Sequence, residues 1–199
     1  MNHQLLVAEY LATPWALMPE RLNAVTAVIA RWSGDARASD EVMRNIAADK
    51  NARDARRQSS VSNSGGGIAV LPLYGIVTQR GNMVDDVSGP GTASTQQFSN
   101  MLRAALQDET VSQILIDIDS PGGSVYGVAE LADEIVSARA KKPVVAIANS
   151  LAASAAYWIG CSASEFYVTP GGEVGSIGVW QAHQDYSKAM DEAGVKTTL

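Results

Sequence analysis

The sequence predicts an α/β fold with a largely parallel β-sheet, and two observations together with one general rule support this prediction. From residue 68 onward, apolar runs of strand length alternate with segments whose apolar residues recur at helical spacing. Glycine-rich and polar stretches separate these segments, as expected of turns and loops. Strands that alternate with crossover helices form right-handed β-α-β units, and such units build a mainly parallel sheet.

The predicted elements follow each other closely along the chain. A polar loop is expected at residues 81–91, over a cleft. The helix expected at residues 95–107 has one apolar face, formed by Phe98, Leu102, Ala105 and Leu106. The other expected elements are strands at 68–73, 75–77, 114–118, 144–148, 166–168 and 176–180, helices at 124–140, 154–161 and 184–193, and a last strand that begins at Val195.

Residues 1–58 differ in character from the rest and are expected to form a helical N-terminal appendage. A second helix of this appendage is predicted from Asp40 toward Lys50. Residues 59–67 are rich in serine and glycine and predict a flexible linker, so that residues 68–199 form the main domain. The first helix of the appendage is predicted after Pro19 from an apolar face of Leu22, Val25, Val28, Ile29 and Trp32.

Composition argues against several classes of function. The net charge of −6 disfavours a general nucleic-acid-binding surface, which needs clustered Lys and Arg. A protein or peptide is therefore the expected partner. The N-terminus lacks the basic segment of a secretory signal, and no apolar window is long enough to cross a bilayer, so we expect no membrane span.

Cys161 is the single cysteine, which excludes an intrachain disulfide and a thiolate metal cluster. We expect it to be a small buried apolar residue. A role as nucleophile would require a histidine and an asparagine beside it, and nothing in the sequence favours Cys161 over Ser154. A cytoplasmic location fits this cysteine usage.

The first candidate functional motif is the segment Asp-Ile-Asp-Ser-Pro-Gly-Gly-Ser at residues 117–124. It lies between a predicted strand and a predicted helix. Glycines at such a turn let backbone N–H groups approach a ligand, because no Cβ intervenes. These donors can bind the negative oxygen that forms when a carbonyl carbon is attacked. The alternative interpretation is an ordinary turn in which Ser120 or Ser124 only caps the helix.

The second motif is Ala-Ala-Ser-Ala-Ala-Tyr-Trp at residues 152–158. It follows the apolar strand predicted at 144–148 and places Ser154 where the next helix begins. Ser154 is alternatively a small residue that lets two helices pack closely. Because both motifs occur on consecutive strand–helix units, we interpret them together as a serine hydrolase site.

These two motifs, followed by Val-Gly-Ser-Ile-Gly-Val at residues 174–179, resemble the S49 peptidases in order and spacing. That family comprises the signal peptide peptidases of the SppA type and the phage head-maturation, or capsid assembly, proteases. The resemblance extends from about residue 68 to the C-terminus, and residues 14–19 and 73–92 resemble the phage branch. It implies a ClpP/crotonase-like superhelix of repeated ββα units.

The resemblance also implies the roles of individual residues. Ser154 is the expected nucleophile, the backbone N–H groups of Gly123 and Ala155 are the expected oxyanion hole, and Gly122 is needed for the turn. The base in this family is a lysine downstream of the serine, and its position falls slightly beyond Leu199. We therefore expect the chain to end before its base and to turn over substrate very weakly.

Other candidate bases in the sequence fit less well. Lys188 and Lys196 do not stand at the family's lysine position, and a solvated lysine is the ordinary interpretation of each. ClpP-type peptidases share the Ser-Pro-Gly-Gly turn and use a histidine, but their histidine lies nearer the serine than His183 does. His183 is followed by Gln and Asp and is expected in an exposed loop or at a helix start.

The sequence predicts neither a metal nor another cofactor. Asp117 and Asp119 lie on one face of a predicted strand, where their charge would favour the start of the adjacent helix. No histidine or further carboxylate accompanies them, which disfavours a metal site. The glycines at 65–67 and 171–172 lack the Lys-Ser/Thr that follows in a phosphate-binding loop.

The leading functional prediction is a serine endopeptidase of the Ser/Lys dyad type that processes phage capsid, portal or scaffold proteins during head maturation. The resemblance further implies a homo-oligomer, in some members with serine and lysine from neighbouring subunits, located in the host cytoplasm or the phage prohead. One alternative is a bacterial peptidase that degrades signal peptides, which the missing anchor disfavours. Another is an assembly module that keeps the fold without the chemistry. The serine motif argues against a crotonase-like acyl-CoA enzyme.

Overall fold

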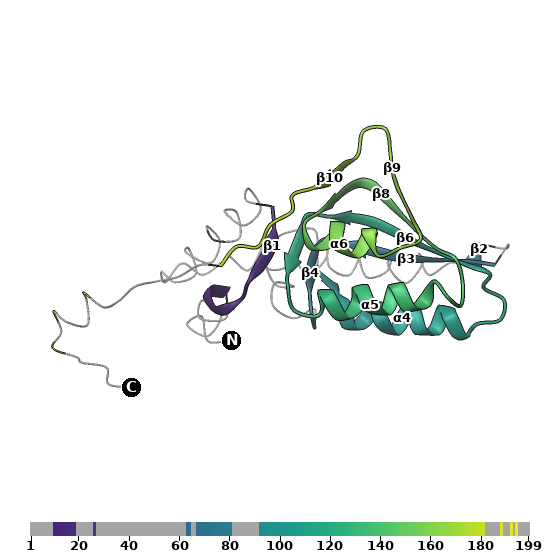
Figure 1. The fold of residues 1–199 in the computed structure, drawn as a ribbon, viewed down its shortest axis with the longest axis horizontal. Coiled ribbons are helices and arrows are strands. Elements are labelled where there is room, and N and C mark those ends of the chain that lie inside the picture. The colour runs from purple at the N-terminus through teal and green to yellow at the C-terminus, as the bar shows by residue number, and fades with distance from the viewer. Residues whose placement is uncertain are drawn as a thin grey trace, which may run out of the picture.

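The structure is a computed structural model of the chain, and it describes residues 10–18, 26, 63–64, 67–80, 92–181, 188, 192 and 194 (Figure 1). Within them, two sheets and three helices surround one main core. The helices are α4 (Thr95–Gln107), α5 (Val128–Ala138) and α6 (Ala155–Cys161). None of the helices in these described stretches combines the length and the apolar character needed to cross a bilayer.

The larger sheet has six strands and is almost entirely parallel. Its central strands β3, β6 and β8 are parallel neighbours, and β9 and β10 both pair in parallel with β8. Only β2 runs antiparallel, at the edge beside β3. The strands are β2 (Asn63–Ser64), β3 (Ile68–Tyr74), β6 (Gln113–Ser120), β8 (Val144–Ala153), β9 (Glu165–Val168) and β10 (Glu173–Gly175).

The smaller sheet has four short strands in the order β1-β7-β4-β5. Its strands are β1 (Trp15–Leu17), β4 (Ile76–Thr78), β5 (Thr92–Ser94) and β7 (Gly122–Ser124). Strand β4 follows β3 after Gly75, and β7 follows β6 after Pro121, so the chain leaves the large sheet and enters the small one twice in the same way.

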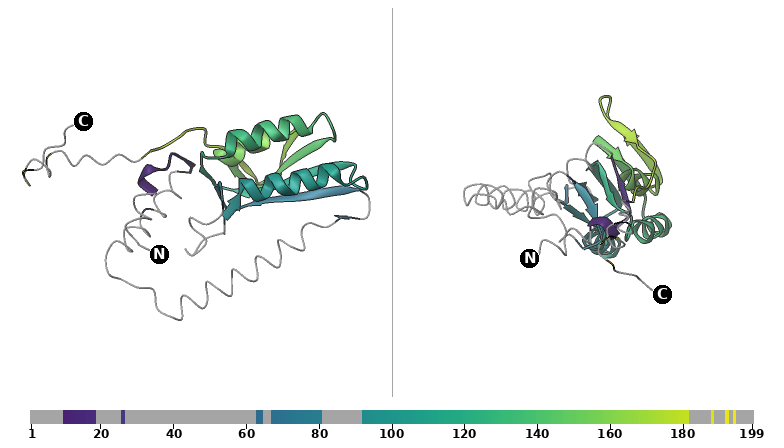
Figure 2. Two further views of the ribbon diagram at one scale, coloured as in Figure 1. Left: turned by 90° about the horizontal axis from the view of Figure 1, so that it is seen from below. Right: turned by 90° about the vertical axis from the view of Figure 1, so that its left-hand side faces the viewer.

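The two sheets and the helices repeat one unit. A long strand of the large sheet is followed by short strand structure in the small sheet and then by a helix. The first unit is β3, β4 and α4, with β5 just before the helix, and the second is β6, β7 and α5. This confirms the predicted α/β fold, its largely parallel sheet and its ββα repeat. Helices α4 and α5 lie side by side along the large sheet, as Figures 1 and 2 show.

Apolar side chains from the sheet and from the inner faces of the helices form the core. On α4, Phe98, Leu102 and Ala105 are buried as predicted, and Leu106 packs partly buried against them. The central strand β6 buries alternate residues, because successive side chains of a strand point to opposite faces of the sheet and one face packs against the core. Its buried apolar residues are Ile114, Ile116 and Ile118.

Several predicted boundaries are wrong. Helix α5 begins at Val128, not at 124, because residues 122–124 form strand β7. The strand expected at 176–180 is absent from that stretch, and β10 lies at 173–175. Cys161 is exposed, not buried, because it ends α6 on the side away from the core.

Other predictions concern residues that lie largely outside the described part. These are the loop at 81–91, the helix at 184–193, the strand from Val195 and both helices expected within 1–58. Two described segments fall in regions predicted as appendage or linker. Residues 15–17 form β1 in the small sheet, and residues 63–64 form β2 beside β3.

Candidate active site

The two motifs meet because β6 and β8 are parallel neighbours. The carboxyl ends of parallel strands lie at the same edge of a sheet, which is where open α/β sheets place their ligand sites. The ladder between β6 and β8 ends with Ser120 opposite Ala152. Gly122 and Ser154 each come two residues later in the chain, just past the ends of β6 and β8. A methyl group built on Gly122 would lie 3.1 Å from Cβ of Ser154.

Ser154 occupies a strained turn between β8 and α6. Its backbone angles are φ 54° and ψ −113°, a region that L-residues other than glycine rarely adopt. Such a conformation costs about 1–3 kcal/mol and persists only where its surroundings enforce it. A serine on a sharp strand-to-helix turn presents its hydroxyl away from both elements, as a nucleophile requires.

The third motif, residues 174–179, holds Ser154 from the other side. Strand β10 pairs with the end of β8, so that Gly175 lies opposite Ala153. The N–H of Ser154 donates to the carbonyl of Gly175 at 2.7 Å, and its Oγ donates to the carbonyl of Gly178 at 3.2 Å. All three motifs therefore converge on this one serine.

The turn after β6 is fixed by a buried hydroxyl. Ser120 is fully buried, donates from Oγ to the carbonyl of Gly75 at 2.6 Å and accepts from the N–H of Gly122 at 3.2 Å. Gly122 has φ +95°, a value that favours glycine. Ser120 thus supports the turn and caps no helix, since the N-cap of α5 is Gly127.

The two predicted oxyanion donors lie in β7 and at the start of α6. Ala155 is the first residue of α6, so its N–H has no acceptor within the helix. Gly123 lies in β7. The residues two positions before and after it, Pro121 and Val125, both form backbone hydrogen bonds with the segment around β1. Because peptide groups alternate along a strand, the N–H of Gly123 points to the same side, toward β1.

The hydroxyl of Ser154 is nearly covered. The residue is 7% exposed, and the partner of its Oγ is a backbone carbonyl. Within the described residues no side-chain base forms a hydrogen bond with this oxygen. Lys142, a lysine of the described part, directs its Nζ to the carbonyls of Ala105 and Asp108 instead.

Comparison with known proteins identifies the family. Residues 126–199 match the model of peptidase family S49. The chain belongs to this family. The family predicted from the motifs is thereby confirmed, and the matched residues contain the second and third of the three motifs. The roles of Ser154, Gly122, Gly123 and Ala155 stay predictions.

Two relatives of the chain come from a phage and a bacterium. The capsid assembly protease C of Escherichia phage lambda is 36% identical over 167 residues, which cover 84% of this chain and 37% of that protein. Protease 4 of Salmonella typhi is 31% identical over 135 residues, or 67% of this chain and 21% of that protein. The chain therefore spans well under half the length of either relative.

A solved structure with a similar fold is a membrane protease from Pyrococcus horikoshii that is specific for a stomatin homolog. It is 22% identical, and the TM-score is 0.42 over 54% of this chain and 48% of that chain.

Neither Asp117 nor Asp119 caps the following helix through a hydrogen bond, because the N-cap of α5 is Gly127 and no side chain bonds there. Asp117 accepts a hydrogen bond from the hydroxyl of Tyr74 on the neighbouring strand β3. Burial, and then this hydrogen bond, raise the pKa of Tyr74 well above its usual value, so the phenol stays protonated and donates. Among the described residues no cluster of His, Cys, Asp and Glu has the composition of a metal site.

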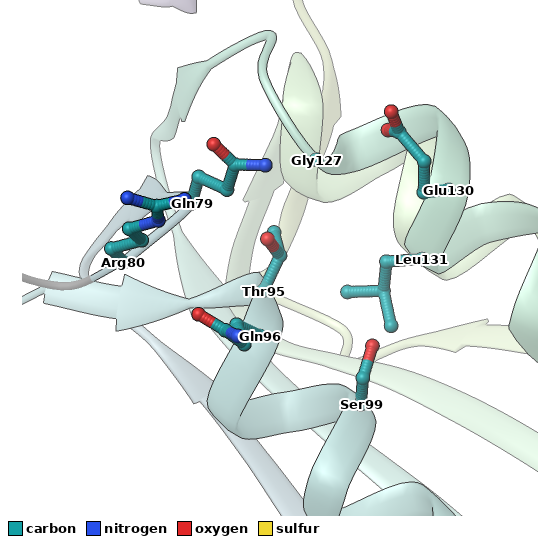
Figure 3. Close-up of a pocket in the computed structure, with 8 residues that line it drawn as sticks. All are labelled: Gln79, Arg80, Thr95, Gln96, Ser99, Gly127, Glu130 and Leu131. Carbon is teal, nitrogen blue, oxygen red and sulfur yellow. The ribbon is translucent and has the colours of Figure 1, made fainter.

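A pocket of about 190 Å³ lies apart from Ser154, between the end of β4 and the first turns of α4 and α5 (Figure 3). Most of its lining residues have polar side chains, and Arg80 and Glu130 provide one charge of each sign. Thr95 and Gly127 meet at its floor, where a methyl group on Gly127 would lie 2.5 Å from Oγ1 of Thr95. It contains none of the residues predicted to carry the S49 chemistry.

Sequence reasoning missed several groups that surround Ser154. The carbonyls of Gly175 and Gly178 accept hydrogen bonds from its N–H and its Oγ, whereas the sequence marks the segment around them only as a family motif. Strand β1 was not predicted, although residues 14–19 resembled the phage branch. A strand of three residues shows no periodicity of its own, so its partner strand is needed to define it.

Proposed function

We propose that this chain is the catalytic unit of a serine endopeptidase of family S49, with Ser154 as nucleophile. The observation that carries the proposal is the convergence of three motifs on Ser154. Gly122 lies against its Cβ, and Gly175 and Gly178 bind its N–H and its Oγ. The amides of Gly123 and Ala155 form the oxyanion hole.

The proposed reaction is acyl transfer. Oγ of Ser154 bonds to the substrate carbonyl carbon as its proton passes to a base, and the negative oxygen is stabilised by the two amides. The C–N bond then breaks, the base returns the proton to the leaving amine, and water hydrolyses the acyl-enzyme. A lysine in a desolvated site is the expected base, because burial lowers its pKa. We place that lysine at the family's position beyond Leu199, or on a neighbouring subunit.

The proposed substrates are proteins of a phage head. The relative from phage lambda is named a capsid assembly protease and matches a larger share of this chain than the bacterial Protease 4 does. Capsid, portal or scaffold proteins are therefore the favoured class, processed by a homo-oligomer in the host cytoplasm or the prohead. Degradation of signal peptides is the second candidate, and the match to Protease 4 is the observation that favours it.

Labelling with a fluorophosphonate tests the nucleophile. We expect one adduct on Ser154, located by peptide mass spectrometry, and none in the Ser154→Ala variant. Ser137→Ala is the matched control, because Ser137 is exposed on α5 and its hydroxyl bonds only within that helix. Labelling elsewhere, or equal labelling of Ser154→Ala, would refute the assignment.

A further inference from the structure

Strand β1 lies where a bound peptide would have to lie. It pairs antiparallel with β7, the strand of the predicted oxyanion glycine, with Ala16 opposite Gly123. The N–H of Val125 donates to the carbonyl of Pro14 at 3.1 Å, and the N–H of Met18 donates to the carbonyl of Pro121 at 3.2 Å. Between these two bonds, alternation directs the peptide groups of Ala16 toward the N–H and carbonyl of Gly123.

The carbonyl of Ala16 lies beside Ser154. A methyl group built on Gly122 would be 2.2 Å from the carbonyl oxygen of Ala16 and 3.1 Å from Cβ of Ser154. Both atoms therefore border the same small space next to Gly122. A carbonyl that faces the amide of Gly123 and lies next to the serine has the placement of the carbonyl to be attacked.

The other edge of β1 is also paired. The N–H of Trp15 donates to the carbonyl of Trp180, and the N–H of Trp180 donates to the carbonyl of Trp15, both at 2.7 Å. Strand β1 thus fills a groove one strand wide, between β7 and the segment that follows the third motif. Pairing of an extended segment on both edges is typical of peptide binding by strand addition.

The side chains of β1 match a groove with alternating character. Ala16 points into the main core and is buried, which leaves room for a small residue only. Trp15 and Leu17 point the other way and pack with Tyr10 in a separate small cluster. The Nε1 of Trp15 also donates to the carbonyl of Tyr10 at 3.0 Å, so contacts within the N-terminal segment help to hold β1 in place.

We propose that β1 is an intramolecular substrate mimic that occupies the peptide groove of this chain, with Ala16 in the place of the residue whose carbonyl is attacked. The inference rests on the proposed function and extends it. The ligand class of the groove is an extended peptide with a small residue opposite Gly123. Any such peptide has to displace β1.

A reversible disulfide tests whether β1 and a bound peptide occupy the same groove. Trp15 lies opposite Ser124 as a pair without mutual hydrogen bonds, for which Cα atoms are about 4.5 Å apart, within disulfide range. The double variant Trp15→Cys/Ser124→Cys, made in a Cys161→Ser background, locks β1 when oxidised and releases it when reduced. The two redox states of one protein are matched controls, and thermal unfolding verifies that both are folded.

The probe is a fluorescein-labelled peptide with the sequence of residues 10–18, and binding is followed by fluorescence polarisation on a Ser154→Ala version. We expect binding to the reduced protein and at least tenfold weaker binding to the oxidised one. A peptide that carries Ala16→Phe should bind the reduced protein at least tenfold more weakly. Equal affinity in both redox states, or no binding in either, would overturn the inference.

Fluorophosphonate labelling separates this inference from the proposed function. In the version that retains Ser154, we expect labelling several-fold faster after reduction. The single variant Ala16→Pro, which removes the N–H directed at Gly123, should likewise be labelled faster than the unmodified chain. If peptide binding depends on the lock but Ser154 never reacts, the hydrolase proposal fails and the occupied groove stands. If Ser154 reacts equally in both states and in Ala16→Pro, the mimic is refuted and the hydrolase stands.

Discussion

Ser154 and the glycines facing it illustrate how single residues set the geometry of the site. The strained backbone of Ser154 is held by short hydrogen bonds and by the neighbouring strand ends. Gly123 lies even closer to its surroundings, because a Cβ there would be 1.9 Å from the carbonyl oxygen of Val77. That oxygen belongs to the backbone of β4, so it cannot rotate away as a side chain would.

We therefore predict that Gly123→Ala destabilises the fold strongly. Strands β7 and β4 would have to separate, which costs about 3 kcal/mol or more. Gly171→Ala is the matched control, because a Cβ there meets nothing within 4 Å, and we expect it to change stability by less than about 0.5 kcal/mol. Urea unfolding of both variants measures the difference. Equal midpoints for the two would show that β7 does not pack against β4 this closely.

Ser120 supports the same turn through its hydroxyl. Ser120→Ala leaves the carbonyl of Gly75 and the N–H of Gly122 without that partner in a buried position, at a cost of about 1–3 kcal/mol. We expect this loss in urea unfolding, together with slower fluorophosphonate labelling of Ser154, since Gly122 loses its support. The exposed Ser137→Ala should change neither quantity. A stable Ser120→Ala with normal labelling would contradict this role.

At the scale of elements, the sequence predicted α4 better than its neighbours because local signals define that helix. Its predicted bounds agree with those found, Ser94 caps its first turn by accepting from the N–H of Gln97, and its apolar residues share one face. These contacts all lie within a few residues of each other. The apolar pattern alone was therefore sufficient to predict this helix, and the cap found at Ser94 agrees with it.

Helix α5 and strand β7 show where local signals fail. Apolar spacing from Val125 continues smoothly into the helix, so the pattern predicted a start near residue 124. The chain instead forms β7, because the backbones of β4 and β1 pair with Gly123 from both sides. Gly127, with φ +78°, then turns the chain into α5. Such pairing depends on residues far away in sequence, which periodicity does not report.

The position of the candidate site could be predicted because long, regular strands lead to it, whereas β1 is short and could not be predicted. Ser154 and the glycines of β7 follow long apolar strands whose parallel order can be inferred from the βαβ pattern, so their meeting at one sheet edge was expected. Strand β1 and the carbonyl of Gly178 reach the site through short irregular segments. No residue-level pattern specifies where such segments dock.

Helix α5 also permits a prediction about packing of the whole element. Ile135 is fully buried against the core, whereas the adjacent Val136 is 44% exposed. Ile135→Ala should lower the free energy of unfolding by about 2–5 kcal/mol through lost burial and a residual cavity. Val136→Ala should lower it by less than about 0.5 kcal/mol. Similar losses at both positions would mean that α5 presents a different face to the sheet.

At the scale of the whole molecule, the described residues form one large and one small cluster of buried apolar side chains. The main core joins the large sheet to all three helices, whereas the second cluster contains only Tyr10, Trp15 and Leu17 with Leu11 beside them. Strand β1 joins the two clusters mainly through backbone hydrogen bonds. Because few apolar contacts hold it, β1 should leave the fold at a lower free energy than the core opens.

Native-state hydrogen exchange in low urea tests this order of opening. The amide of Val125 is protected by the carbonyl of Pro14 and becomes exposed when β1 leaves, whereas that of Ile116 lies in the central strand between β3 and β8. We expect Val125 to exchange with a smaller opening free energy and a much weaker urea dependence, because undocking three residues exposes little surface. Ile116 should follow global unfolding. Identical free energies and slopes for the two amides would show that β1 is a permanent part of the core, which a displaceable occupant of the groove cannot be.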